Sequence, residues 1–246
     1  MIVVLFKWIN DNAQITSAVG FCYPACLPGW AWGYNSAGVC LSSNALTPNP
    51  TKVGRAASLV AADALFFSTS LEDAIARCCI DGQGGGQHFN LGSSLNGING
   101  PRYSVEASPI HSSVYEVTDE YYVHCNVYLR SEDCGVTNLR TPGPFEDSSR
   151  CRRERAIEIA SSTNITNSSL QSIVGAVLGD TSNKEFPICR NAIAPDYGIS
   201  DHAVIFDLEN AVCEVYRNSS LSPTGLAVRG DRLDDIALVF HLPSRR

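Results

Sequence analysis

WAWGYNSAGVCLSSNAL, residues 30–46, carries the clearest structural signal in the sequence. Two runs that favour β-structure, residues 30–35 and 39–44, flank the short segment Ser36-Ala37-Gly38. Runs of this length on either side of a glycine-containing turn predict a pair of adjacent strands. The segments around this pair extend the same kind of pattern.

Strands and pairs of helices alternate along the chain. Residues 2–9 and 13–19 predict two strands joined by a turn. A helix is predicted over residues 54–67, because apolar residues recur at steps of three and four: Ala57, Val60, Ala61, Ala64 and Leu65. A second helix begins after Ser70, whose SLED sequence (70–73) resembles a capping box, and runs to about Cys79. Further strands are predicted at 89–95, 102–106, 114–117, 121–128, 203–208, 212–217, 225–229 and 236–240, and further helices at 149–161 and 168–178.

This order of strands, two helices, strands, two helices and strands determines the expected fold class. Helices in pairs fit the outer faces of two stacked, mainly antiparallel sheets, whereas a doubly wound parallel sheet alternates single strands with single helices. We therefore expect an α+β fold, a four-layer α-β-β-α sandwich. With 246 residues, 44% of them hydrophobic, the chain is long enough to bury a core, and we treat residues 1–246 as one domain.

The charge balance argues against some partners. The chain has 18 basic and 25 acidic residues, a net charge of −7, so neither nucleic acid nor an anionic membrane is an expected partner. The densest basic run, Arg150, Arg152, Arg153 and Arg155, is interrupted by acidic residues, and we interpret it as a solvated helix face. No stretch approaches the ~18–20 apolar residues of a membrane span.

Ten cysteines occur without a CxxC pair, so a structural zinc site is not expected. No cofactor is expected either, because the glycine run DGQGGG (81–86) leaves a helix and enters a strand, the wrong order for a phosphate loop. The cysteines and the sequons at Asn164, Asn167 and Asn218 lean towards a secretory compartment, which stays open.

Four segments, in order, resemble one family. They are GYNSAGVCLSSNAL (33–46); SSLN (93–96) with SVEASP (104–109); VHCN (123–126); and FPICR (186–190) with DHAVIFD (201–207). Each is short, but together they resemble the acyl-coenzyme A:6-aminopenicillanic-acid acyltransferase (isopenicillin N acyltransferase) family of cysteine N-terminal-nucleophile hydrolases.

The resemblance implies a fold and a chemistry. The fold would be the N-terminal-nucleophile sandwich, in which a precursor cleaves itself before a cysteine whose own α-amine then serves as base. The substrates would be small N-acyl amines or acyl thioesters, processed through a cysteine acyl-enzyme. Asn126 would donate to the oxyanion, and Arg190 would be the cation beside the nucleophile. His124 would contact substrate, although an ordered strand histidine is the alternative.

The sequence departs from the family pattern in two places. Val127 replaces the second histidine of the family's HxNH segment. The family's nucleophile also precedes the region that begins here at Met1, so we expect a chain that lacks its first strands and its nucleophile, with a processed N-terminal subunit as a possible partner. Cys22 and Cys26 are the early substitutes, in a loop bounded by prolines.

Two rival interpretations stay open. One is a catalytically inactive relative that keeps the sandwich as a binding or structural module. The other is an unrelated secreted protein stabilised by disulfides, which would show paired cysteines and would keep Asn126 far from Arg190.

Overall fold

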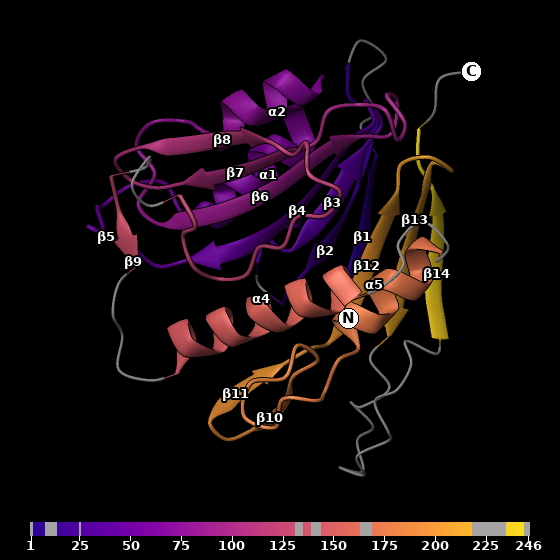
Figure 1. Cartoon of the computed structure of the whole chain (residues 1–246). Helices are drawn as coiled ribbons and strands as arrows, with labels where there is room; N and C mark the ends of the chain where they lie inside the picture. Colours follow the sequence, from indigo (N-terminus) through magenta and orange to yellow (C-terminus); the bar gives the residue numbers. More distant parts are fainter. Residues whose placement is uncertain are drawn as a thin grey trace.

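The computed structural model describes residues 2–7, 14–24, 26–130, 135–138, 144–162, 169–217 and 235–243. Two antiparallel sheets and two pairs of helices make up most of this part (Figure 1). The predicted strand at 225–229, the three sequons and Cys134 lie outside the described residues.

The larger sheet has seven strands in the order β1-β2-β3-β4-β6-β7-β8, and each neighbouring pair is antiparallel. The predicted strand pair of residues 30–46 is confirmed as β3 and β4 at the centre of this sheet. The strands are β1 Ile2–Lys7, β2 Ser17–Cys22, β3 Trp32–Asn35, β4 Val39–Leu46, β6 Gly86–Ser93, β7 Tyr103–Ala107 and β8 Ser112–Glu116.

Asn35 fastens the turn between β3 and β4 to a helix. Its Oδ1 accepts hydrogen bonds from the N–H groups of Ala37 and Val39, and its Nδ2 donates to the carbonyls of Leu65 and Ser68 at the end of α1. The side chain is completely buried, so all four bonds are shielded from water. This accounts for an asparagine in the turn of the opening motif.

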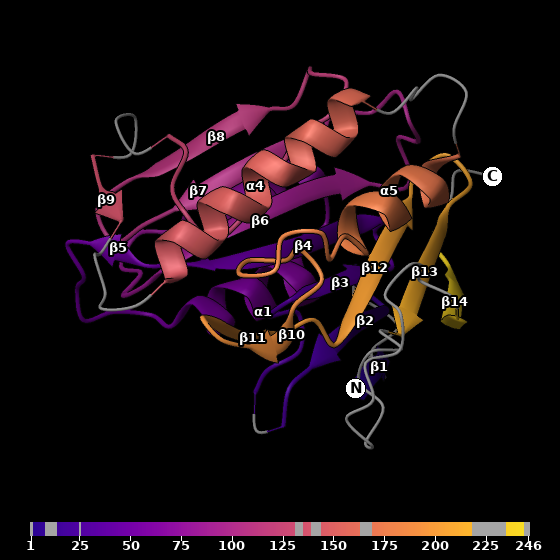
Figure 2. The same ribbon diagram turned by 60° about the horizontal axis from the view of Figure 1, so that its bottom comes forward.

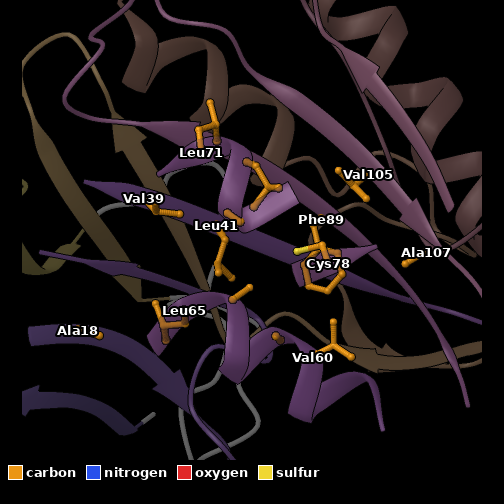
Figure 3. Packing of buried hydrophobic residues seen from close by; sticks show 14 residues of the cluster. Ala18, Val39, Leu41, Val60, Leu65, Leu71, Cys78, Phe89, Val105 and Ala107 are labelled. Atoms are coloured by element: carbon orange, nitrogen blue, oxygen red, sulfur yellow. The ribbon is translucent and has the colours of Figure 1, made fainter. Parts of the chain in front are cut away.

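Helices α1 (Ala57–Phe67) and α2 (Leu71–Cys78) cover one face of the larger sheet. A core of aliphatic and aromatic side chains joins them to β4, β6 and β7, including Leu41, Leu65 and Phe89 (Figure 3). The predicted capping box is present, since Ser70 Oγ accepts from the Asp73 N–H at 3.2 Å. The Asp73 carboxylate returns to the N–H of Thr69 rather than to that of Ser70.

The opposite face of the larger sheet carries the second sheet and the second helix pair (Figure 2). Phe21, Trp32 and Cys40 of the larger sheet pack against Cys213 and Val215 of the smaller one. The smaller sheet has the order β12-β13-β14, and α5 packs on β12. The bounds are α4 Phe145–Ser162, α5 Leu170–Leu178, β12 His202–Asp207, β13 Val212–Arg217 and β14 Asp235–His241. Helices outside two antiparallel sheets are the predicted α+β arrangement.

Two short hairpin-like pairs complete the described elements. Strands β5 (Pro48–Asn49) and β9 (Thr137–Asn138) pair with each other, as do β10 (Asn191–Ile193) and β11 (Asp196–Ile199). None of these four was predicted. None of the described helices is long and apolar enough to cross a bilayer.

The strand predicted at residues 121–128 is wrong. This segment joins no sheet, and side chains from other elements bond to its backbone instead: Arg153 Nε donates to the Val123 carbonyl, Asn44 Nδ2 to the His124 carbonyl, and the Asn126 N–H donates to Ser149 Oγ. An apolar run with such partners needs no neighbouring strand to satisfy its backbone groups.

Candidate functional site

A cavity of about 370 Å³ lies where the end of β4, the 126–127 segment, β9 and the start of α4 meet. Both predicted catalytic residues, Asn126 and Arg190, line it, although 64 residues (190 − 126) separate them in sequence. Figure 2 shows the start of α4 beside the β10–β11 hairpin, which Arg190 precedes. The lining residues are Ala45, Thr47, Asn126, Val127, Asn138, Phe145, Glu146, Ser148, Ser149, Arg152 and Arg190.

Asn126 is held at three points. Its Nδ2 donates to the Ala45 carbonyl at 3.1 Å, its Oδ1 accepts from Arg152 Nη2 at 3.0 Å, and its backbone N–H donates to Ser149 Oγ at 3.3 Å. A carbonyl acceptor at one end and a guanidinium donor at the other define which way the amide points. Because an amide nitrogen has two N–H groups, one stays available for a ligand in the cavity.

Arg190 lies over the β10–β11 hairpin. Its Nη1 is 3.7 Å from Asp196 Oδ1, and its guanidinium packs directly on Gly198, where an added Cβ would come within 2.3 Å of Nη1. Asp196 is buried and also accepts from Ser148 Oγ and from the Gly198 N–H. Burial alone would raise the pKa of Asp196, but these hydrogen bonds and the nearby guanidinium groups lower it, so the carboxylate is ionised.

Arg152 is the site residue that sequence reasoning missed. The solvated-face interpretation fits Arg150, whose side chain is 55% exposed, but it is wrong for Arg152. Arg152 is half-buried and donates to Ser148, Ser149 and Asn126. Helical spacing could have indicated that Arg152 is buried. Arg152 follows Ser149 by three residues and Ser148 by four, and Ala156 follows it by four, so all of them lie on the buried face of α4.

The structure places His124 outside this cavity. Its side chain is 1% exposed, its Nε2 is 2.8 Å from Glu106 Oε1, and its ring stacks on that of His88 at 3.4 Å between centroids. His88 in turn contacts Ser104 Oγ at 2.9 Å. Burial lowers the pKa of His88 well below its ordinary value, and the neighbouring His124 lowers it further, so His88 is neutral. His124 therefore belongs to a buried polar cluster next to the site.

No cysteine of the described residues lines the cavity. Cys125 is the neighbour in sequence, and its thiol lies close enough to Arg152, Arg153 and Arg190 to feel their charge, yet burial raises its pKa above the ordinary value. Cys22 Sγ donates to the Cys26 carbonyl at 2.9 Å, and neither of these cysteines lines the cavity. No disulfide joins the nine cysteines in the described part of the chain.

These observations decide against the unrelated disulfide-stabilised protein. That interpretation required mostly paired cysteines and a wide separation of Asn126 from Arg190. The described cysteines form no disulfide with one another, and the two side chains line one cavity. Within the same residues, His, Cys, Asp and Glu side chains do not gather in threes that could hold a metal ion.

Two stacked antiparallel sheets with outer helices define the class of protein as the N-terminal-nucleophile hydrolase fold. The chain belongs to the family described as acyl-coenzyme A:6-aminopenicillanic acid acyl-transferase, whose model matches residues 8–220. Membership indicates amide or acyl hydrolase or acyltransferase activity. No curated protein matches the sequence.

A solved structure supports the fold. A mutant form of conjugated bile acid hydrolase from Clostridium perfringens superposes with a TM-score of 0.52 at 10% identity, over 89% of this chain and 82% of that one. The N-acylethanolamine-hydrolyzing acid amidase ortholog of Caenorhabditis elegans gives a TM-score of 0.43 at 13% identity, over 98% of this chain and 88% of that one.

Proposed function

We propose that this protein cleaves or forms amide bonds of small N-acyl amines or acyl thioesters, through a cysteine acyl-enzyme formed at the cavity of Asn126 and Arg190. The observation that supports this proposal is their shared cavity. The amide of Asn126 lies beside the end of β4, where it bonds to the Ala45 carbonyl. The guanidinium of Arg190, which directly precedes the β10–β11 hairpin, reaches the same cavity.

The family resemblance gives each residue a role in this reaction. The thiolate attacks the carbonyl carbon, and the carbonyl oxygen becomes an oxyanion that accepts from the remaining Nδ2–H of Asn126. The α-amine of the cysteine, which took the proton of the thiol, gives that proton to the leaving nitrogen as the C–N bond breaks, and water or an amine then takes the acyl group from sulfur. Arg190 lowers the pKa of the attacking thiol and attracts its anion. The donation from Arg152 to Asn126 Oδ1 holds the amide in the donating orientation.

The nucleophile comes from outside the described lining, because that lining contains no cysteine. We place it on a processed N-terminal subunit, with the loop of Cys22 and Cys26 as the alternative source. His124 acts as a positioning residue two positions before Asn126, because its ring is held by Glu106 and its carbonyl by Asn44.

One observation favours a second candidate, the inactive relative. Both polar atoms of the Asn126 side chain already bond within the protein, to Ala45 and to Arg152. An asparagine bonded in this way also serves as a purely structural clamp between β4 and α4.

The test uses the full-length gene product and an acylating probe, p-nitrophenyl hexanoate. Intact-mass analysis should show a processed chain that takes up one hexanoyl group on a cysteine. Asn126→Ala should slow acylation by about 10²–10³-fold, the typical loss of one oxyanion donor, while Asn90→Ala, exposed on β6, should leave the rate unchanged. An unprocessed protein that takes up no label would establish the inactive relative instead.

A further inference from the structure

Two cysteines of one surface loop lie outside the cavity of Asn126 and Arg190. Cys22 ends β2, and Cys26 follows it by four positions. Both thiols are free, and Cys26 is exposed whereas Cys22 is half-buried. Solvent-accessible thiols react with oxidants, while thiols buried in a core are inert. Four other cysteines are of the buried kind: Cys40, Cys78, Cys189 and Cys213.

The Cys22 sulfur already lies against the main chain of Cys26. Its Sγ donates to the Cys26 carbonyl at 2.9 Å, and the Cys26 N–H donates to the Tyr23 carbonyl at 3.0 Å, which closes a tight turn. A carbonyl oxygen is roughly 2.4 Å from its own Cα, so the 2.9 Å bond places Cys22 Sγ within roughly 5.3 Å of the Cys26 Cα. In a disulfide these two atoms are roughly 4 Å apart. Rotation of the exposed Cys26 side chain and a loop shift of about 1 Å at most therefore close the bridge.

The loop packs beside the segment that carries Arg190. Phe21, which precedes the first cysteine, contacts the ring of His202 at 4.4 Å between centroids, and Tyr23 lies edge-on to Phe21 at 4.5 Å. Burial and the nearby Asp201 carboxylate raise the pKa of Tyr23, whereas the Arg190 guanidinium lowers it, so the phenol lies near both charges. A bond between the two cysteines that flank Tyr23 would restrain the loop at this place.

We infer that Cys22 and Cys26 form a disulfide when a low-molecular-weight disulfide such as oxidised glutathione is present. The exposed Cys26 thiolate attacks one glutathione sulfur, the S–S bond of glutathione breaks, and the first glutathione leaves as a thiolate that takes a proton from water. Cys22 loses its proton to water, and its sulfur attacks the Cys26 sulfur and releases the second glutathione. Two protein thiols are oxidised to one disulfide, and one glutathione disulfide is reduced to two thiols. The bridge does not depend on the proposed function.

The first experiment maps the bridge in the full-length protein. The reduced, folded protein is treated with an excess of oxidised glutathione, denatured and alkylated with N-ethylmaleimide, and trypsin releases residues 8–52 as one peptide with three cysteines, Cys22, Cys26 and Cys40. We expect this peptide to lack two hydrogen atoms and to carry one maleimide group, on Cys40. Maleimide on all three cysteines, glutathione that stays attached to Cys26, or a bond from this loop to a different cysteine would overturn the inference.

The second experiment tests the order of the two steps. Cys22→Ser removes the thiol that resolves the mixed disulfide, so the exposed Cys26 should keep one glutathione as a stable adduct. Cys151→Ser, which removes a half-buried thiol on α4, should form the bridge as the wild type does. Circular dichroism checks that each variant folds, and if Cys22→Ser does not fold, the wild-type and Cys151→Ser maps decide. A folded Cys22→Ser protein that takes up no glutathione would contradict Cys26 as the attacking thiol.

The third experiment measures the restraint on the loop. A bridge that closes a short loop limits the unfolded chain, so the oxidised wild type should melt about 3–6 °C above the reduced wild type. Cys26→Ser, treated with glutathione in the same way, should show no such rise. Equal melting temperatures for the oxidised and reduced wild type would show that the bridge does not restrain the loop, and would overturn that part of the inference.

Discussion

At the scale of single residues, Glu106 shows how a buried charge is stabilised. Its carboxylate accepts from His124 Nε2 at 2.8 Å, from the Leu129 N–H at 2.8 Å and from the Arg130 N–H at 3.1 Å. Burial would raise the pKa of Glu106, but His124 and the two backbone donors outweigh it and lower the pKa below its ordinary value. The fold therefore depends on this carboxylate being ionised.

Replacing Glu106 tests that dependence through pH. A depressed carboxyl pKa adds stability that is complete above the unfolded pKa of about 4.3 and is lost as the pH falls through the lower folded value. Glu106→Gln should lower the free energy of unfolding at pH 7 by about 1–3 kcal/mol, because it leaves buried hydrogen-bond donors without their acceptor, and should flatten the acid side of the melting-temperature profile. Glu116→Gln, exposed on β8, is the matched control. Parallel acid profiles for wild type and Glu106→Gln would contradict this account.

At the scale of elements, the predicted positions were good wherever local chemistry decides the structure. Helix α2 begins where Ser70 and Asp73 predicted it, because an N-cap satisfies N–H groups within a single turn. The sequence could not show that residues 121–128 avoid a sheet. Their partners Asn44 and Arg153 lie some 80 and 30 residues away, so the local pattern remained that of a strand.

The cap of α2 gives a prediction at this scale. Ser70→Ala removes the acceptor for the Asp73 N–H and should lower the free energy of unfolding by about 1 kcal/mol, measured as a lower midpoint of urea unfolding. Ser161→Ala makes the same change in α4, where the exposed hydroxyl donates back to the Ile157 carbonyl. That variant should be neutral or slightly more stable, because such back-bonding slightly destabilises a helix. Equal losses in the two variants would show that the cap contributes nothing specific.

At the scale of the whole molecule, the order of helices and strands was enough to predict the layers but not the composition of the site. The family resemblance pointed to Asn126 and Arg190, and the fold brings both to one cavity. Arg152 and Asp196 came only from the structure, because they bond to residues 26 and 48 positions away in the sequence, Asn126 and Ser148. Contacts over such distances depend on how the layers stack, which no local pattern encodes.

Leu65 is where that stacking is tightest. It is completely buried in α1, and three glycines from the β2–β3 region surround its side chain. A Cβ added at Gly20, Gly29 or Gly33 would lie 2.9, 2.9 or 2.8 Å from Leu65 carbon atoms, so the helix approaches the sheet as closely as glycine permits.

Truncating this side chain tests how far the helix layer and the larger sheet depend on each other. Leu65→Ala should lower the free energy of unfolding by about 2–5 kcal/mol, because the close-packed neighbours cannot collapse into the space. Leu59→Ala makes the same change on α1 where the side chain is 48% exposed, and should stay within about 1 kcal/mol of wild type. Urea unfolding followed by tryptophan fluorescence, with Trp32 on the far face of the larger sheet as a reporter, measures both. If the two variants unfold at the same midpoint, the packing of Leu65 between α1 and the larger sheet does not contribute to stability as proposed.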